Sequence, residues 1–371
     1  MKTLLFIWLL PIALLFAADG IQYTHFELPN SSYFSSITGS QSIHVIEVDP
    51  SLYEIKPVKA LDNGLGRETV LSLSQRYSAI ASVNGGFFSI GGTLDGRACG
   101  TLKIHDWYAL PIKPRGCIGW SASDLRPRFD RLLATASMQS GDQIILLSGL
   151  NRVRKEGEAI LFTPAFHRTT LTFPDGEELT VIDGVIQKIV KGGSCKIPEN
   201  GYVVSIQKSH PLFGTFEEGG KLAISINTDS LTGVHPAAEW DQLDYIVGGT
   251  PLLLYHSSRI VDFSSEQTLT TFLTYRHART AVGVLPNGNW VFVLVEKTGF
   301  FDGMTMDELT GLMARLGCVH ALNLDGGGSS TMVYEGLITN SATEYGKGDN
   351  VHDREVPRRV SDAIVIVPKR I

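Results

Sequence analysis

The segment Asn323–Met332, NLDGGGSSTM, places one carboxylate directly before three consecutive glycines and three small hydroxyl residues. Successive backbone N–H groups in such a loop can form a concave site for an anion. An aspartate at its edge can act as a base, a nucleophile or a metal ligand. A nucleotide-binding P-loop would need a lysine followed by serine or threonine at the start of a helix, and here strand-like residues follow the glycines. A tight turn without chemistry is the alternative, although two residues usually suffice for a hairpin.

The elements before this loop are marked by regular patterns. Residues 304–317, MTMDELTGLMARLG, predict a helix in which Thr305 and Glu308 form a capping box and Gly317 supplies the stop. The following CVHALNL predicts a strand that ends at Asp325. Upstream, TAVGVLPNGNWVFVLVE predicts two strands around an Asn-Gly turn, which is a strong hairpin signal.

A second place in the chain has the same layout. Residues 67–77, RETVLSLSQRY, predict a helix capped by Thr69, and the following SAIASV predicts a strand that leads to Asn84-Gly85-Gly86. Helix, buried strand and a polar residue followed by glycines therefore occur twice. This shared layout predicts that the two strand ends converge on one site.

The remaining sequence is predominantly of β type. Short apolar runs alternate with turn signals between residues 100 and 261, and residues 33–60 alternate around Asp49-Pro50 as a hairpin would. We therefore expect an α+β (mixed α/β) fold: a largely β framework with short packed helices, forming a single catalytic domain. Its expected boundaries are residues 69–369, preceded by a β-rich extension over residues 19–68.

Composition and the N-terminus limit the setting of the protein. The chain has 371 residues, 43% of them hydrophobic and 19% charged, with a formal charge of −6 and no long basic block, which argues against nucleic-acid binding. Residues 1–18 combine one lysine, an apolar stretch and a small-residue exit, as in a signal peptide. A membrane anchor is the alternative, but this run is shorter than a spanning helix requires and contains Pro11. We expect a secreted or periplasmic protein with no stable membrane span after signal removal.

The four cysteines, Cys99, Cys117, Cys195 and Cys318, permit three disulfide pairings in an oxidising compartment. Cys99 with Cys117 is the simplest pairing because both lie in one short β-rich segment. Buried free thiols are the alternative. Their spacing does not favour a metal site.

Several of these segments together resemble the phosphodiester glycosidase family. The similarity is carried by SVNGGFFS, RHARTAVGVLPNGNW, GMTMDELTGLMARLG and ALNLDGGGSSTMVYEG, and it extends in order from about Thr69 to Val367. It implies hydrolysis of the bond between an α-linked sugar, N-acetylglucosamine or a similar one, and a phosphodiester. Two departures lie near the expected site, at residues 296–299 (EKTG) and 356–359 (VPRR).

The resemblance also suggests roles for particular residues. Asp325 is the expected base or nucleophile, and Glu296 is a second carboxylate candidate because it also ends an apolar strand. Arg279 is the expected phosphate ligand, since a guanidinium can bind two phosphate oxygens at once. The alternatives are a strand-edge salt bridge for Arg279, a solvated strand end for Glu296 and a turn role for Asn84. The remaining expected substrate-binding residues are Asn84, Gly326, Gly327, Gly328, Ser329, Ser330 and Thr331.

Other functions are compatible with the same groove. A phosphodiesterase would cleave the phosphorus–oxygen bond instead, and a non-catalytic module would bind cell-wall or glycan phosphate without turnover. No cofactor or metal is expected. A hard cation held by Asp325 with Asn323 or Asp302 is the alternative, because such ions prefer oxygen ligands.

Overall fold

The chain forms a mostly β structure with few short helices. The computed structural model describes residues 13–28, 39–341 and 357–369, with only the backbone described for residues 13–18. Strands account for 44% and helices for 11%. The expected β framework with short helices is therefore confirmed, whereas the helical share is too small for a balanced mixture of helix and sheet.

Two sheets build the part of the molecule that carries the predicted site. Side chains of both sheets, including Trp290, Phe292, Val83 and Ile364, meet in one large core. The eight-stranded sheet has the order β1 (Ala13–Ala18), β2 (Ile21–Leu28), β3 (Gln41–Val48), β23 (Trp290–Val295), β22 (Arg279–Val284), β24 (His320–Asn323), β20 (Leu252–Tyr255), β21 (Ser258–Arg259). The five-stranded sheet has the order β26 (Leu337–Ile338), β25 (Met332–Tyr334), β5 (Ala81–Asn84), β27 (Asp362–Pro368), β4 (Tyr53–Lys59).

The strongest local predictions are confirmed. Strands β22 and β23 pair antiparallel around the Asn287-Gly288 turn, where Gly288 has a φ of 90°. Helix α4 spans Met306–Arg315, and its capping box joins Thr305 and Glu308 reciprocally. Helix α1 spans Val70–Arg76, and the Thr69 side chain accepts the Ser72 N–H. Both helices lie directly before the strands β24 and β5 that lead to the predicted site.

The predicted hairpin around Asp49-Pro50 is wrong in its pairing. Both strands form, but β3 pairs with β2 and β23, whereas β4 pairs with β27 in the other sheet. The turn therefore carries the chain from one sheet to the other. Buried and half-buried residues alternate along part of each strand, as they do in hairpin strands, so this pattern does not reveal the partners of the two strands.

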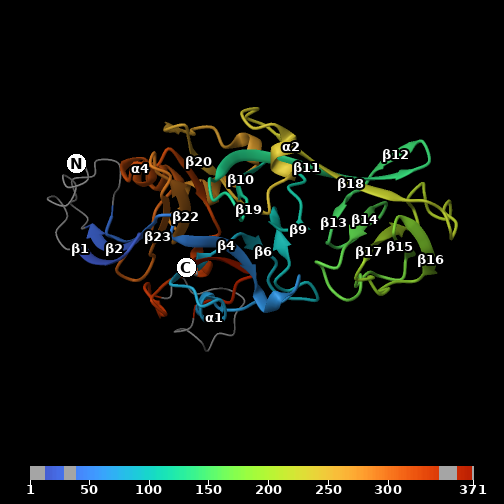
Figure 1. Ribbon diagram of the computed structural model, residues 1–371, viewed down its shortest axis with the longest axis horizontal. Coiled ribbons are helices and arrows are strands. Elements are labelled where there is room, and N and C mark those ends of the chain that lie inside the picture. The colour runs from blue at the N-terminus through green and yellow to red at the C-terminus, as the bar shows by residue number, and fades with distance from the viewer. Residues whose placement is uncertain (1–12, 29–38, 342–356, 370–371) are drawn as a thin grey trace.

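Most of the stretch from residue 100 to 261 builds a second part of the molecule and is of β type, as predicted, whereas β20 and β21 join the eight-stranded sheet. Figure 1 shows this second part extending away from both termini, with the long strands β11 (Arg128–Ser140) and β18 (Ala223–Ser230) leading into it. A seven-stranded sheet contains β12 (Gln143–Leu146), β11, β10 (Arg115–Trp120), β19 (Tyr245–Gly249), β8 (Leu102–Ile104) and β9 (Asp106–Ala109), with β18 paired to β11. A separate five-stranded sheet has the order β13 (Gly149–Leu150), β14 (Ala159–Phe162), β17 (Gly201–Gln207), β15 (Gly176–Ile182), β16 (Val185–Lys191).

The remaining short strands, β6 (Phe87–Phe88) and β7 (Ala98–Cys99), form a two-stranded sheet. Among the described residues, the short helices are α2 (Ala237–Asp241), α3 (Thr270–Thr274) and three single turns of 3-10 helix at Ala60–Asp62, Ser264–Glu266 and Gly327–Ser329.

The N-terminal region contributes strands to both of the first two sheets. Residues 1–12 of the segment interpreted as a signal peptide lie outside the described residues, and Ala13–Ala18 forms β1 against β2. Within the residues expected to be an extension, β3 and β4 lie next to strands from the C-terminal half of the chain. Among the helices that the structure describes, none has the length and apolarity needed to cross a membrane.

The predicted Cys99–Cys117 disulfide is wrong, since all four cysteines are free thiols. Cys99 lies beside Ser89 and Arg97, with the Ser89 hydroxyl 3.2 Å from its sulfur. Cys117 is fully buried, and burial raises the pKa of its thiol to about 12. The two residues belong to separate sheets, one on β7 and the other on β10, so closeness in sequence does not bring them together.

Candidate active site

The two glycine-containing strand ends meet, as their shared layout predicted. The side-chain amide of Asn84 donates to the carbonyl of Asp325 at 2.8 Å, and the N–H of Asp325 donates to the carbonyl of Gly85 at 3.2 Å. The loop after Asp325 then crosses from β24 in the eight-stranded sheet to β25 in the five-stranded sheet. Asp325 therefore lies in the connection between the two sheets, next to the end of β5.

Asp325 is half-buried as a residue, and protein surrounds its carboxyl group. Burial raises its pKa to about 6, against the opposing effects of a Ser329 hydrogen bond, the Gly326 N–H and the nearby Arg358 charge. The Asp362 carboxylate adds to the increase. A carboxyl group with a pKa near neutrality can exchange protons at physiological pH, which is the property that a general base requires.

The expected anion site of three glycine amides is only partly available. The Gly326 N–H donates to the carboxylate of Asp325 at 2.9 Å, and the Gly327 N–H donates to the carbonyl of Ala278 at 2.8 Å. Residues Gly327–Ser329 form one turn of 3-10 helix. The first two amides therefore hold the loop and its carboxylate in place, which corrects the expectation that they bind phosphate.

Arg279 does not have the placement that a phosphate ligand requires. Its side chain is fully buried, with Nε donating to the Met304 carbonyl and Nη2 donating to the Phe272 and Tyr275 carbonyls, each at 2.8 Å. Its guanidinium also lies 4.8 Å from the centre of the Phe272 ring. Arg279 thus ties α3 and the segment before α4 to the start of β22, because buried carbonyls need donors.

The remaining polar residues of the loop are also buried. Asn84 Oδ1 accepts the Thr280 hydroxyl at 2.8 Å and the Thr331 N–H at 3.2 Å, so this side chain joins β5, β22 and the loop. The Ser330 and Thr280 hydroxyl oxygens lie 3.2 Å apart. Ser329, Ser330 and Thr331 are each at most 2% exposed. With the exception of Ser329, which contacts Asp325, we therefore assign these residues to positioning the loop rather than to contact with a ligand.

Glu296 belongs to a separate buried network. Its Oε1 lies 3.3 Å from His44 Nε2 and accepts the Ser341 N–H at 2.6 Å. His44 in turn lies 2.8 Å from the Tyr23 hydroxyl. Burial raises the pKa of Glu296, but the hydrogen bonds from His44 and Ser341 outweigh it and leave the pKa below its ordinary value. The residue is only 4% exposed, so the alternative of a solvated strand end is wrong.

Two residues that the sequence did not mark lie close to Asp325. Arg358 is half-buried, and its Nη1 lies 3.4 Å from the Ser329 hydroxyl. A β-carbon added at Gly328 would lie 2.5 Å from Arg358 Nη2, so the guanidinium rests on the glycine loop. Arg358 lies in the VPRR segment that departs from the family pattern. The expected closeness of that segment to the site was the sequence signal that could have pointed to Arg358.

Asp362 is the second such residue. It is buried, its Oδ1 accepts the Gly86 N–H at 2.9 Å, and burial raises its pKa. Its partner in the β4 register is the buried Lys59, whose pKa burial lowers to about 8. A single aspartate at the start of an apolar strand gives no sequence signal for this arrangement.

The alternative of a bound cation receives no support from the described residues. Within residues 13–28, 39–341 and 357–369 there is no group of three His, Cys, Asp or Glu side chains arranged to hold a metal. Asn323 donates its amide to the Thr250 and Leu324 carbonyls, and Asp302 accepts the Ser40 N–H.

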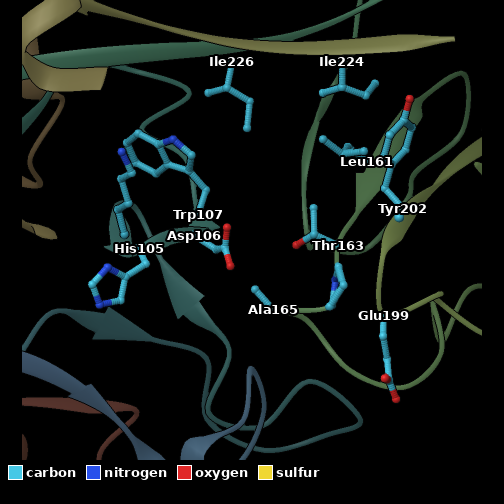
Figure 2. Close-up of a pocket in the computed structure, with 13 residues that line it drawn as sticks. His105, Asp106, Trp107, Leu161, Thr163, Ala165, Glu199, Tyr202, Ile224 and Ile226 are labelled. Atoms are coloured by element: carbon cyan, nitrogen blue, oxygen red, sulfur yellow. The ribbon is translucent and has the colours of Figure 1, made fainter. Parts of the chain in front are cut away.

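A pocket lies in a different part of the molecule, between β9 and the sheet that contains β14 and β17 (Figure 2). It shares no lining residue with the surroundings of Asp325. We therefore place the candidate catalytic group at the loop and consider this pocket separately below.

The loop lies within the part of the chain that matches a known protein family. Residues 176–367, which include it, match the family model for phosphodiester glycosidases. An uncharacterized protein of Rickettsia conorii is 26% identical over 241 residues, covering 60% of this chain and 77% of that protein. The Bos taurus N-acetylglucosamine-1-phosphodiester alpha-N-acetylglucosaminidase is 25% identical over 206 residues, covering 49% of this chain and 38% of that enzyme.

Solved structures share the fold. A hypothetical protein from Synechocystis superposes with a TM-score of 0.79 at 21% identity, covering 97% of this chain and 64% of that one. A Burkholderia pseudomallei protein, described as a candidate exported protein, superposes with a TM-score of 0.73 at 22% identity, covering 90% of this chain and 75% of that one. The chain thus spans under two thirds of the bovine and Synechocystis proteins.

Proposed function

Because the chain belongs to the phosphodiester glycosidase family, we propose that it hydrolyses the bond between an α-linked sugar and a phosphodiester. The sugar is N-acetylglucosamine or a close relative, because the bovine relative is an N-acetylglucosamine-1-phosphodiester alpha-N-acetylglucosaminidase. The observation that carries the proposal is Asp325: the residue is half-buried, its carboxylate is held by its own loop, and burial of that group raises its pKa to about 6.

The reaction that suits this site is attack of water on the sugar carbon. Asp325 accepts a proton from the water, the water oxygen bonds to the anomeric carbon, and the carbon–oxygen bond to phosphate breaks. Its electron pair leaves with the phosphate oxygen. The leaving group is a phosphate monoester, which needs far less protonation than an alcohol, so a strong general acid beside it is unnecessary. Direct attack by Asp325 followed by hydrolysis is the other course open to a glycosidase carboxylate.

Arg358 takes the phosphate-binding role that the sequence suggested for Arg279. Its guanidinium rests on Gly328, is partly exposed, and acts electrostatically on Asp325. A guanidinium there can pair with phosphate oxygens while Asp325 faces the sugar carbon. Glu296 is engaged with His44 and Ser341, so we assign it a positioning role for the segment after β26 rather than a catalytic one.

The setting proposed for this reaction is outside the cytoplasm. The N-terminal sequence has the three parts of a signal peptide, and a solved structure with the same fold is described as a candidate exported protein. Glycans and cell-wall polymers that carry sugar phosphates would be the substrates met there.

The decisive test is hydrolysis of an N-acetylglucosamine α-1-phosphodiester in heavy-oxygen water. Label should be absent from the released phosphate monoester, because water attacks carbon. Label in the phosphate would establish phosphodiesterase chemistry instead, and saturable binding without turnover would establish a binding module. Asp325→Asn should abolish turnover, while Asp142→Asn, in the exposed turn between β11 and β12, serves as the matched control. A folded Asp325→Asn protein with full turnover would exclude Asp325.

A further inference from the structure

A cavity of about 490 Å³ lies between the β8–β9 hairpin and the sheet that contains β14 and β17. Figure 2 shows Trp107 on one side, Tyr202 on the other, and Ile224 and Ile226 of β18 above them. The Asp106 carboxylate and the Thr163 hydroxyl point into the space between the walls. This volume lies within the range of ligand pockets in proteins, about 300–1,000 Å³.

The two walls are fixed relative to each other. Asn151 is 1% exposed, and its side-chain amide donates to the Trp107 carbonyl at 3.2 Å and to the Thr163 hydroxyl at 3.1 Å. Its Oδ1 accepts the Thr163 N–H at 3.0 Å. One buried side chain therefore joins the β9 wall to the β14 wall. A cavity whose walls are tied in this way exists before any ligand enters, which reduces the ordering cost of binding.

The aromatic side chains are held in position by polar contacts. The Lys103 ammonium lies 5.6 Å from the centre of the Trp107 ring and donates to the Asp241 carbonyl at 2.7 Å. The Tyr202 hydroxyl donates to the Leu222 carbonyl at 2.6 Å. Both rings remain half-buried. Rigid aromatic surfaces that keep some exposure suit a ligand with flat apolar faces.

The charge of the cavity selects against an anion. The Asp106 and Glu199 side chains both line the cavity, and both residues are exposed. The cavity's one lysine, Lys103, already donates to a protein carbonyl and lies over the Trp107 ring. Carboxylate and hydroxyl oxygens here can accept from sugar hydroxyls, whereas phosphate or carboxylate groups on a ligand would be repelled.

We propose that this cavity is an oligosaccharide-binding site that takes uncharged sugar units, which stack on Trp107 or Tyr202 and donate hydroxyl hydrogen bonds to Asp106. The site is separate from the loop of Asp325, and its occupancy does not require Asp325 to be catalytic. In an enzyme that removes sugars from a glycan phosphate, it would hold a neutral part of the glycan chain while the phosphate lies elsewhere.

The test is calorimetric titration of the full chain with neutral di- to tetrasaccharides of N-acetylglucosamine. We expect saturable binding that Trp107→Ala and Asp106→Ala each weaken by about tenfold or more, as loss of a central contact does. Phe300→Ala is the matched control, since Phe300 is an aromatic residue with 87% exposure that does not line the cavity. Because Asp106 is exposed, its variant should fold even if Trp107→Ala does not.

The result also separates this proposal from the catalytic one. Asp325→Asn should keep full oligosaccharide affinity even though it loses turnover. An affinity unchanged in folded Asp106→Ala and Trp107→Ala proteins would overturn the proposal. So would the absence of saturation by any neutral oligosaccharide, preferred binding of a sulfated oligosaccharide, or binding restricted to an apolar dye.

Discussion

Asn84 and Asp325, which lie at the ends of strands from two different sheets, are joined by a hydrogen bond, and a second bond links Asp325 to Gly85. The Asn84 amide donates to the Asp325 carbonyl at 2.8 Å, while the Asp325 N–H donates to the carbonyl of Gly85, the next residue after Asn84. Each strand end thereby fixes the conformation of the other. The Asp325 carboxylate is left to bond with its own loop, through the Gly326 N–H and the Ser329 hydroxyl.

The raised pKa of Asp325 predicts the acidic limb of the pH–rate profile. A base must be ionised, so kcat/KM should increase with pH through about 6, the pKa of Asp325, and level off above it. Initial rates on a sugar-1-phosphodiester over a pH series would measure this limb. A rate that falls as the pH increases through this range would contradict the role of base and indicate a general acid.

The two arginines should behave differently when they are replaced. Arg358→Gln should increase KM for the phosphodiester by about tenfold or more, since a charge-assisted hydrogen bond contributes about 1.5–3 kcal/mol. It should also shift the acidic limb to higher pH, because the Arg358 charge lowers the pKa of Asp325. Kinetic measurements across pH would show both effects.

Arg279→Met should instead destabilise the fold by about 3 kcal/mol or more, since it leaves buried carbonyls without donors. Urea unfolding measures that loss. A stable Arg279→Met protein with an increased KM would restore the role that the sequence suggested for Arg279.

The sequence predicts local structure near the site better than the contacts within it. The capping box of Thr305, the β22–β23 hairpin and the meeting of the two strand ends depend on neighbouring residues or on a repeated layout, and all three are confirmed. The pairing of β3 and β4 and the free thiols of Cys99 and Cys117 depend on which sheet each strand joins. No local pattern encodes that choice.

The polar residues of the site illustrate the same limit. An arginine at a strand start has the same appearance in sequence whether it faces a ligand or buried carbonyls, and only the packing of α3 makes Arg279 structural. Arg358 and Asp362 reach Asp325 from the C-terminal end of the chain. The pairing of β27 with β5 brings these two residues close to Asp325, and no sequence pattern near Asp325 indicates that pairing.

Asp362 should tune Asp325 without contacting the substrate. Its carboxylate raises the pKa of Asp325, so Asp362→Asn should shift the acidic limb of kcat/KM to lower pH. Asparagine can still accept the Gly86 N–H through its side-chain oxygen, which keeps the turn in place. The shift should be opposite in sign to that of Arg358→Gln. An unchanged limb combined with a lower stability would show that Asp362 has only a structural role.

Gly85 should not tolerate even one additional carbon atom. A β-carbon at this position would lie 2.0 Å from Asp362 Oδ1 and 3.2 Å from the Asp362 carbonyl oxygen. Gly85→Ala should therefore displace the turn that accepts the Asp325 N–H, and we expect a loss of both stability and turnover. Gly299→Ala is the matched control because nothing lies within 4 Å of its added carbon. Thermal unfolding and turnover of the two variants make the comparison, and equal behaviour would contradict the close packing.

Glu296 should make the stability of the protein depend on pH. Burial raises its pKa, but the His44 and Ser341 hydrogen bonds outweigh this effect and lower the pKa below its ordinary value of 4.5. A lowered folded-state pKa means that Glu296 stabilises the protein above pH 4.5 and that this contribution is lost as the pH falls through the folded-state pKa. Glu296→Gln should therefore reduce the free energy of unfolding by about 1–3 kcal/mol near pH 7. The difference from the wild type should be smaller at a pH below the folded-state pKa of Glu296.

Urea unfolding at pH 7 and at that lower pH measures this difference for the wild type, Glu296→Gln and the exposed control Glu156→Gln. A difference that grows as the pH falls would show that the carboxylate destabilises the fold and that the network forms without it.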